Sequence, residues 1–359
     1  MKNLEEILTG EPKFRLKQIK KAVFVDLIDD WEKVTTLPKE LRQKLAENYP
    51  ILELKEEKIL ASKNNQTTKA LFVLNDGLQI ETVLMKHEVD LTNSPQAGRR
   101  TVCVSSQAGC AMNCQFCATG QQGFNRNLSA EEIIDQVLFF ARFLKKSNEK
   151  VTNVVFMGMG EPFLNYDNVL AATKILNDKD GFNLGARHIS ISTCGIIEGI
   201  ERLANEKMQI NLAISLHAPN NEIRSRLMPI NEKYPIEKIL ASVDDYIKKT
   251  GRRVMFEYLM IDGVNDSEAQ AEELAKLLIY NLHFGNQKNF SREDRGFYFV
   301  NLISFNPIGH SEFKPSPGWK IKKFKEILEK MGVVVTQRYR FGKEIKAACG
   351  QLAGKENEI

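Results

Sequence analysis

The sequence predicts an α/β fold in which a partial (β/α)6 barrel of the TIM type follows a small N-terminal helical accessory domain and a connecting β-hairpin. Six short apolar segments alternate with six segments of helical periodicity between residues 101 and 331. Such alternation is typical of parallel strands joined by crossover helices. Before residue 60, apolar residues recur at three-to-four spacing, which predicts amphipathic helices. Between these regions, two β-prone runs flank an Asp-Gly pair, a common hairpin signal.

The composition is that of a globular protein. The chain has 359 residues, 43% hydrophobic and 27% charged, enough for a barrel-sized core with an appendage. Its net charge of +4 permits binding to nucleic acid without demonstrating it. Glu5 and Glu6 stand where a signal peptide would be apolar, and no run is long enough to cross a bilayer. Six cysteines do not make a disulfide scaffold at this length, so we expect a cytoplasmic protein with no membrane partner.

The N-terminal domain is expected at residues 1–60, with helices at 3–8, 13–27 and 38–48. Its second helix carries a basic face formed by Lys13, Arg15, Lys17, Lys20 and Lys21. Such a face is usually solvated, and the alternative is a phosphate-contacting arm. Taken alone, the pattern favours the solvated face.

Residues 61–95 are expected to form the hairpin and a linker, with strands at 69–74 and 78–84 around Asp76-Gly77. Glu81 lies in the second strand among apolar neighbours. A lone glutamate in that position normally faces water. Its local sequence therefore assigns it no chemistry.

The barrel is expected at residues 96–342, followed by a C-terminal segment at 343–359. Its strands are predicted at 101–105, 151–157, 188–192, 209–216, 253–260 and 297–305. Its helices are predicted at 130–144, 167–177, 195–205, 236–249, 267–280 and 320–331. The polar stretch 281–296 is interpreted as a surface insertion before the sixth strand.

Three cysteines lie within eight residues, as Cys110, Cys114 and Cys117 with the spacing C-x3-C-x2-C. Three thiolates can hold three irons of a [4Fe-4S] cluster and leave the fourth iron open to a small molecule. A zinc knuckle is the alternative, but structural zinc takes four ligands and no second pair follows. Buried structural cysteines are a further alternative. The spacing favours the cluster.

Polar and glycine residues follow the predicted strands, where parallel barrels build their sites. They are Gly160, Glu161, Ser192, Ser215, His217 and Asn306, with Leu216 between two of them. Glu161 could accept a hydrogen bond from an ammonium group, whereas His217 alone would more often be a packed histidine. Their occurrence at several strand ends, beside a cluster motif, favours a binding site.

Cys103, Cys194 and Cys349 have no role that spacing can assign. A buried thiol usually behaves as a small hydrophobic residue. A thiol beside a ligand pocket could instead be a nucleophile or a resolving thiol. Both possibilities remain open for all three.

Several runs together resemble the RlmN/Cfr branch of the radical S-adenosylmethionine (SAM) enzymes, and the resemblance extends over residues 18–354. Beside the cysteine triplet, they are residues 103–107, 121–128, 157–162, 214–220, 226–231, 263–266 and 347–352. The resemblance implies that the barrel is a radical SAM core. It also implies one [4Fe-4S] cluster on Cys110, Cys114 and Cys117, and two SAM molecules for each turnover.

The resemblance implies a mechanism that uses two further cysteines. One SAM methylates Cys349, and a second SAM, bound to the open iron, gives a 5′-deoxyadenosyl radical that takes a hydrogen from the S-methyl group. The methylene radical adds to an adenine carbon, Glu81 accepts the ring proton, and Cys103 releases the product by a transient disulfide with Cys349. The seven residues at the strand ends match SAM-contacting positions: Gly160, Glu161, Ser192, Ser215, Leu216, His217 and Asn306.

The implied activity is methylation of C2 of an adenosine in 23S rRNA, near the peptidyl transferase centre, and of the adenosine 3′ of the tRNA anticodon. Such bases lie in loops and can be splayed out. We expect a monomer that receives electrons from a donor such as flavodoxin. The basic helix becomes a better candidate for RNA contact, as do Arg99, Arg100, Arg338 and Arg340.

Two alternatives remain. A Cfr-type enzyme would methylate adenine C8 of 23S rRNA with the same cysteines, as in antibiotic resistance, but Pro162 and the run 121–128 resemble the C2 branch more closely. A non-catalytic metal-binding RNA module would bind zinc and lack the thiol relay.

Overall fold

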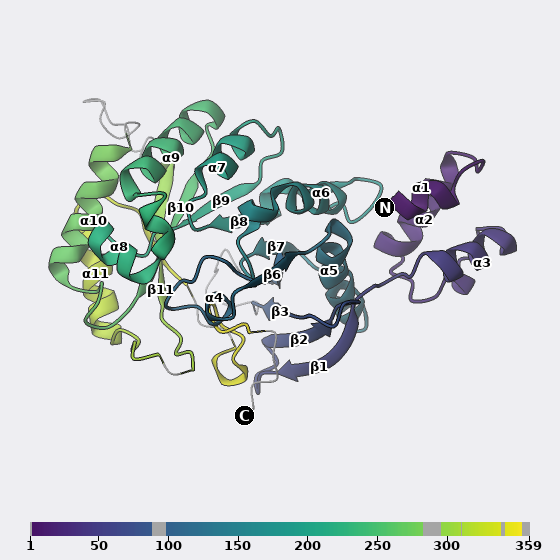
Figure 1. The fold of residues 1–359 in the computed structure, drawn as a ribbon, viewed down its shortest axis with the longest axis horizontal. Coiled ribbons are helices and arrows are strands. Elements are labelled where there is room, and N and C mark those ends of the chain that lie inside the picture. Colours follow the sequence, from purple (N-terminus) through teal and green to yellow (C-terminus); the bar gives the residue numbers. More distant parts are fainter. Residues whose placement is uncertain (1, 88–97, 283–295, 310, 339–341, 354–359) are drawn as a thin grey trace.

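The computed structural model describes residues 2–87, 98–282, 296–309, 311–338 and 342–353. Short helices form one end of the molecule (Figure 1). They are α1 (Lys2–Ile7), α2 (Phe14–Lys20), the π-helical turn η1 (Lys21–Val25), the 3-10 turn η2 (Trp31–Lys33) and α3 (Lys39–Asn48). Their small core contains Ile19, Trp31 and Leu45, and the indole of Trp31 donates a hydrogen bond to the carbonyl of Tyr49 at 2.7 Å. The predicted N-terminal helices are thus present, although the second ends as a π-turn.

Three antiparallel strands follow: β1 (Lys55–Ala61), β2 (Thr67–Val73) and β3 (Gln79–Lys86). The predicted hairpin is confirmed by β2 and β3, which turn at Asp76 and Gly77. Strand β1 spans residue 60, where the N-terminal domain was expected to end and the hairpin to begin. It is a charged, largely exposed edge strand, and edge strands often lack the apolar alternation by which strands are recognised.

The sheet continues from β3 into a parallel series. Its members are β4 (Arg100–Val104), β7 (Asn153–Phe156), β8 (Ile189–Thr193), β9 (Asn211–Ser215), β10 (Val254–Met260), β11 (Tyr298–Ser304) and β12 (Val335–Gln337). The first six confirm the predicted (β/α)6 order, while the short β12 was not predicted. The ten strands run β1-β2-β3-β4-β7-β8-β9-β10-β11-β12. Because β1 and β12 are edges in that order, the barrel is open, as predicted.

Six helices cover the outside of this sheet (Figure 1). They are α5 (Ala130–Lys145), α6 (Tyr166–Asn177), α7 (Ile197–Ala204), α9 (Ile236–Thr250), α10 (Glu268–Asn281) and α11 (Gly318–Lys330). Each matches a predicted helix to within a few residues. Two of them begin at a full capping box, Ser129 with Glu132 and Ser267 with Gln270, which satisfies N–H groups at the helix start.

Shorter elements were not predicted, because few residues carry their signal. They are β5 (Gln107–Gly109), β6 (Phe124–Asn127), α4 (Ala118–Gln121), α8 (Asn221–Leu227), η3 (Pro162–Asn165), η4 (Ala186–His188), η5 (Pro229–Glu232) and η8 (Lys343–Ile345). Strands β5 and β6 form a separate antiparallel pair. No helix in the described part of the chain is long and apolar enough to cross a membrane. The predicted insertion at 281–296 lies almost wholly outside the described residues.

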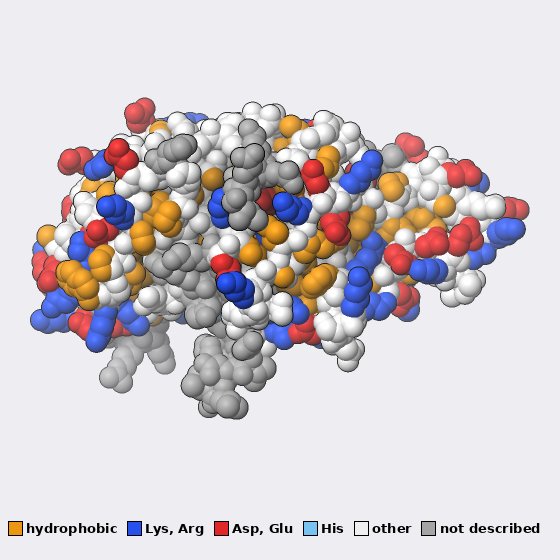
Figure 2. Space-filling view, turned by 90° about the horizontal axis from the view of Figure 1, so that it is seen from below, with side chains coloured by type: hydrophobic (Ala, Val, Ile, Leu, Met, Phe, Trp, Pro, Cys, Tyr) orange, Lys and Arg blue, Asp and Glu red, His pale blue; other side chains and the backbone are white. Residues whose placement is uncertain are grey.

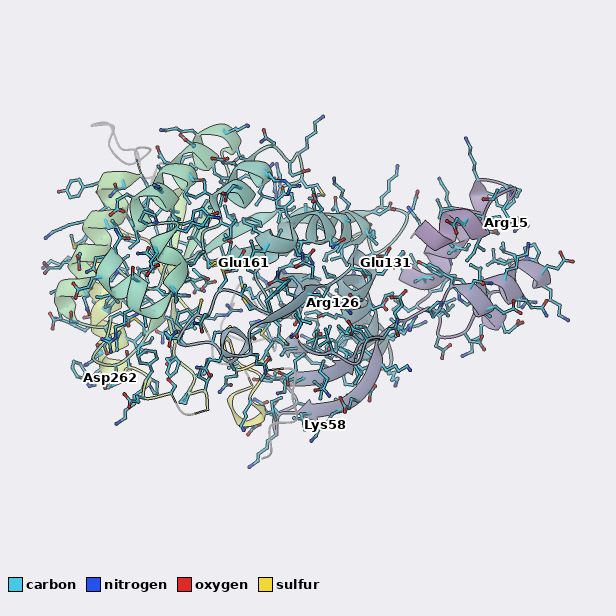
Figure 3. All side chains as sticks on the ribbon, in the orientation of Figure 1. Arg15, Lys58, Arg126, Glu131, Glu161 and Asp262 are labelled. Carbon is cyan, nitrogen blue, oxygen red and sulfur yellow. The ribbon has the colours of Figure 1, made fainter. Side chains whose placement is uncertain are left out.

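The N-terminal helices contact the barrel through charged groups. Lys20 pairs with Asp178 at 2.5 Å and Lys17 with Asp180 at 3.7 Å, both in the loop after α6. Lys21 pairs with Asp26 inside the unit. Figure 2 shows positive and negative side chains interspersed over this end of the molecule, and Figure 3 shows Arg15 remote from Glu161 in the barrel. Much of the predicted basic face is therefore balanced by carboxylates.

Candidate functional site

The largest group of predicted site residues surrounds one cavity of about 160 Å³. Nine of them line it: Cys110, Cys114, Cys117, Gly160, Glu161, Ser192, Ser215, His217 and Cys349. Most belong to loops or strand ends at the carboxyl side of the parallel strands, which is where barrels of this class place their sites. The side chain of Leu216, another predicted site residue, is fully buried and lies outside the cavity lining. Its backbone N–H instead donates to the carbonyl of Glu257.

The cluster loop, residues 110–117, is held on both sides. The N–H of Cys110 donates to the carbonyl of Gly123 at 2.8 Å, and the N–H of Gln115 donates to the carbonyl of Leu227 at 2.9 Å. The ring of Phe116 packs edge-on against the ring of His217, with centroids 4.9 Å apart. These contacts fix the loop against α8 and the end of β9.

Cys110 and Cys114 of the cluster loop are buried, and Cys117 is half-buried. Burial raises the pKa of Cys110 to about 12, and it also raises the pKa values of Cys114 and Cys117. Neutral thiols are favoured there until a bound positive group supplies the opposite charge.

Three thiols of one loop that line one cavity suit a [4Fe-4S] cluster. Among the residues that the structure describes, no three His, Cys, Asp or Glu side chains converge on the position of a single metal ion. The two observations are compatible, because each cysteine of a cluster binds its own iron and the sulfurs need not converge on one point. The donor set therefore fits such a cluster, which Cys110, Cys114 and Cys117 would hold.

Glu161 lies opposite the cluster loop, after β7. One carboxylate oxygen accepts from the N–H of Phe163 at 3.0 Å, and the other accepts from the N–H of Cys194 at 2.8 Å. Burial raises the pKa of this carboxyl. Each oxygen retains capacity for another donor, so Glu161 can accept a hydrogen bond from an ammonium group in the cavity. Cys194 lines the same cavity.

Gly160 allows the loop after β7 to pass close to β5, the strand that precedes the cluster loop. Its φ is +98°, and a Cβ there would lie 2.5 Å from Cβ of Gln107. The side-chain oxygen of Gln107 in turn accepts from the N–H of Glu161 at 2.8 Å. Glycine at 160 therefore sets the position of the Glu161 carboxylate.

We expect Gly160→Ala to lower both stability and cosubstrate binding. The backbone strain and the overlap with Gln107 should together cost about 1–3 kcal/mol of unfolding free energy. The displaced Glu161 should weaken SAM binding by about tenfold. Thermal unfolding and equilibrium dialysis with labelled SAM measure the two effects.

Gly251 provides a matched control. It has φ of +63°, and a Cβ added at this position would have no neighbour within 4 Å. It ends α9 away from the cavity. Gly251→Ala should therefore lower the free energy of unfolding through backbone strain alone, without any change in SAM binding. Equal loss of SAM binding in the two variants would contradict the role assigned to Gly160.

The remaining polar groups at the strand ends are held by short contacts. The hydroxyls of Ser192 and Ser215 lie 3.4 Å apart on neighbouring strands. His217 has φ of +58°, and its Nδ1 accepts from the N–H of Leu259 at 3.1 Å. Burial, and then the nearby cation Arg224, lower the pKa of His217 to about 3. This histidine is thus a neutral packing and orienting group at physiological pH.

Residues 346–353 of the predicted segment 343–359, called the C-terminal segment from here on, carry the last cysteine of the chain back to the cavity. The N–H of Ala118 donates to the carbonyl of Gly350 at 2.7 Å. The hydroxyl of Thr119 donates to the carbonyl of Leu352 at 2.6 Å. Both donors lie in α4, directly after the cluster loop, and Figure 1 shows the segment in yellow beside this helix.

Gly350 and Asn306 bring Cys349 to its place. Gly350 has φ of +81°, and a Cβ there would lie 2.9 Å from the carbonyl oxygen of Phe116 in the cluster loop. On the other side, the amide of Asn306 donates to the carbonyl of Cys349 at 3.5 Å. Asn306 follows β11, so the segment contacts both the cluster loop and the barrel.

Cys103 and Cys349 line a second, smaller cavity of about 40 Å³, together with Asn306 and Arg338. Burial raises the pKa of Cys103 to about 12, and Cys349 acts in the same direction, whereas Arg338 opposes the shift. Cys349 also lines the larger cavity. It is therefore placed between the cluster loop on one side and Cys103 on the other.

Glu81 does not line either cavity among the described residues. Its buried carboxylate pairs with Lys69 at 2.6 Å and accepts from the N–H of Ala353 at 2.7 Å. The expectation that a glutamate here faces water is wrong, because Glu81 is 2% exposed. The signal that could have revealed its burial is Lys69, an opposite charge within the preceding strand.

Among the arginines expected to contact RNA, the described ones differ in their surroundings. Arg99 is exposed, and Arg100 pairs with Glu149. Arg338 lines both cavities described above and a third of about 400 Å³ near the amino ends of the strands. Arg340 lies outside the described residues. Arg338, expected to contact RNA at the surface, therefore lies beside the thiols of Cys103 and Cys349.

Glu257 is a site residue that the sequence did not indicate. It lies in β10, accepts from the amide of Asn301 at 2.9 Å, and approaches Arg338 to 3.8 Å. It lines the 160 Å³ cavity beside the cluster loop and also the third cavity of about 400 Å³. A glutamate within an otherwise apolar run, residues 254–260, was the available signal. By itself that signal does not distinguish a buried acid from one facing solvent.

Comparisons with known proteins agree with this geometry. Residues 104–277 match the family model of the Radical SAM superfamily. The chain is 48% identical to the ribosomal RNA large subunit methyltransferase N of Nitrosopumilus maritimus, over 96% of this chain and 93% of that protein. It is 44% identical to the probable dual-specificity RNA methyltransferase RlmN of Chloroflexus aurantiacus, over 99% and 92%. The crystal structure of a radical SAM methyltransferase from Sphaerobacter thermophilus superposes with a TM-score of 0.88 at 44% identity, covering 98% of this chain and 97% of that one.

Proposed function

The chain belongs to the RlmN family of radical SAM RNA methyltransferases, and from this membership we propose that it methylates C2 of adenosine in two RNAs. The targets are an adenosine of 23S rRNA near the peptidyl transferase centre and the adenosine 3′ of the anticodon in tRNA. Two SAM molecules are used for each methyl group transferred. The reaction takes place in the cytoplasm, in a monomer supplied with electrons by a donor such as flavodoxin.

The chemistry of the target carbon explains why a radical is required. Adenine C2 lies between two ring nitrogens and has no lone pair with which to attack the methyl group of SAM. When bound, the cluster and SAM supply a carbon radical that can remove a hydrogen atom from an unactivated methyl group. The protein must therefore hold a methyl-bearing group close to the cluster and exclude water around it.

Cys349 is the proposed methyl carrier. Its placement in the lining of the same cavity as Cys110, Cys114 and Cys117 is the observation that carries the proposal. These residues are more than 230 positions apart in the sequence. Such an arrangement gives a sulfur nucleophile direct access to a cosubstrate held at the cluster loop.

Cys103 is the proposed resolving thiol. It shares the smaller cavity with Cys349. After the methylene group joins Cys349 to the base, the Cys103 thiolate attacks the sulfur of Cys349. A disulfide forms, the bond between sulfur and the methylene carbon breaks with its electron pair on carbon, and a proton completes the new methyl group. Arg338 beside the two thiols favours the thiolate that this step requires.

The remaining polar residues hold the cosubstrate in the proposal. Glu161 accepts from the ammonium group of SAM, and Gly160, Ser192, Ser215 and His217 shape its binding site. Asn306 lines the smaller cavity and would contact SAM from the side of Cys349. Leu216 contributes through its backbone, because its side chain is outside the cavity. Glu81 accepts the proton from the adenine ring, which requires the base to reach a carboxylate now covered by Ala353.

Product mapping tests the proposed reaction. The gene would be expressed in a host without its own enzyme of this family, and nucleosides from 23S rRNA and tRNA would be analysed by mass spectrometry. We expect 2-methyladenosine at one position in each RNA. A product methylated only at C8 would show a Cfr-type activity instead. A zinc-containing, colourless protein that forms no product and cannot be loaded with iron would indicate a binding module.

A further inference from the structure

A buried ion pair lies beside the site without lining it. Lys69 of β2 and Glu81 of β3 are 6% and 3% exposed in their side chains, and their charged atoms are 2.6 Å apart. Lys69 is paired across the sheet with Val83, and Glu81 with Leu71. The two charges are therefore diagonal neighbours on one face of the hairpin, a distance that long side chains can span.

Each member of this pair also binds one end of the C-terminal segment. The ammonium group of Lys69 donates to the carbonyl of Lys346 at 3.2 Å. The carboxylate of Glu81 accepts from the N–H of Ala353 at 2.7 Å. Cys349 lies between these two attachment points. Hydrogen bonds to charged partners are stronger than those between neutral groups, so one ion pair fixes the segment on both sides of its cysteine.

We propose that Lys69 and Glu81 form a clasp that holds the C-terminal segment closed, and that RNA binding opens it. In the open form, the substrate base takes the place of the Ala353 N–H on the Glu81 carboxylate. Lys69 is then a positioning residue for the methyl transfer. This inference rests on the proposed function, because it assigns the opening step to an RNA base.

The position of Glu81 explains why opening is needed. Leu352, next to Ala353, lines both cavities that contain Cys349, whereas Glu81 lines neither among the described residues. A base inside the cavity is therefore separated from the carboxylate by residues 352 and 353. The closed form presents Cys349 to the cosubstrate site, and the open form gives the base access to Glu81.

The charge on Lys69 gives the clasp its strength. Lys69 fixes the Glu81 carboxylate at 2.6 Å, and that same carboxylate accepts from the N–H of Ala353. Without Lys69, the carboxylate loses the partner that orients it toward Ala353. Loss of Lys69 should thus release both ends of the segment, one directly and the other through Glu81.

Hydrogen exchange followed by mass spectrometry tests the clasp in the full chain loaded with its cluster. We expect Lys69→Met to speed exchange of the backbone amides between residues 347 and 353 by at least about tenfold. Lys69→Arg, which keeps the charge and the donors, should restore most of the protection. Glu81→Gln, which keeps an acceptor for Ala353 but loses the ion pair, should give an intermediate rate.

Lys86→Met is the matched control. Lys86 also lies in this antiparallel sheet and pairs with Glu149 at 2.7 Å, but it does not contact the C-terminal segment in the described hydrogen bonds and ion pairs. Its loss should leave exchange at 347–353 unchanged. Circular dichroism and thermal unfolding verify that each variant is folded. Unchanged exchange in folded Lys69→Met and Glu81→Gln, or equal acceleration in Lys86→Met, would overturn the clasp.

The opening step has its own measurement. A synthetic anticodon stem-loop RNA would be added to the wild-type protein without reductant, and binding would be monitored by fluorescence anisotropy. We expect exchange at Ala353 to rise in the complex. Bound RNA with unchanged or slower exchange would overturn opening by RNA. An RNA that does not bind here, and is not methylated when reductant and SAM are then supplied, would refute the proposed function instead, while the variants above would still decide whether the clasp exists.

Discussion

Replacing Cys349 by alanine should abolish RNA methylation, with a loss of at least about a thousandfold. The physical reason is that the proposed route carries the methyl carbon on this sulfur. Among the described residues, no other thiol lines both the cavity of the cluster loop and the cavity of Cys103. The cluster loop is not altered by the substitution. Cys349→Ala should therefore bind iron and sulfide like the wild type, and intact-protein mass should show no S-methyl group.

Cys194→Ala is the matched control for this experiment. Cys194 is a buried thiol that lines the larger cavity, but it does not line the cavity of Cys103. Its loss should reduce the rate by less than about tenfold, as expected for the removal of one small buried group. Methylation of RNA by Cys349→Ala at a rate close to that of Cys194→Ala would refute the thiol relay.

Replacing Cys103 by alanine should trap the enzyme on its RNA after a single turnover. Without the second thiol, the bond between the Cys349 sulfur and the methylene carbon has no attacking group in the shared cavity. We expect a covalent protein–RNA adduct that approaches one RNA per protein. Denaturing electrophoresis of labelled RNA measures it. The double variant Cys103→Ala with Cys349→Ala should form none.

The release step should also depend on pH. Burial raises the pKa of Cys103 to about 12, so the thiolate fraction increases as the pH rises throughout the accessible range. Release measured in a single turnover of the wild type should accelerate by up to about tenfold for each pH unit above neutrality. Catalytic turnover by Cys103→Ala without an adduct, or release that is independent of pH, would contradict the role assigned to this thiol.

The parallel part of the fold could be predicted because its signals are local and repeated. The six barrel helices are amphipathic, and each follows a short apolar strand, so periodicity alone located them. The bounds of strand β1 could not be located, because its exposed, charged residues carry little alternation. Strand β12 has only three residues, and its pairing with β11 depends on the rest of the sheet.

The candidate site was predictable to different degrees. Cys110, Cys114 and Cys117 lie within eight residues, so their spacing alone was enough to propose that they act together. The proposed roles of Cys103 and Cys349 entered only through resemblance, because their approach depends on the path of the C-terminal segment. Glu81 shows the limit most clearly. Its burial depends on Lys69 in the neighbouring strand, which the hairpin pattern could have indicated, and on Ala353 at the other end of the chain, which no local pattern encodes.

The most direct measurement of the central claim is reductive cleavage of SAM by the purified protein. The chain would be loaded with iron and sulfide under nitrogen, reduced with dithionite, and incubated with SAM, and 5′-deoxyadenosine would be quantified by chromatography. The wild type should produce it, whereas Cys114→Ala, which removes one of the three thiols that the cluster loop presents to the cavity, should not. Wild-type protein that holds a reduced four-iron cluster and forms no 5′-deoxyadenosine would contradict the account.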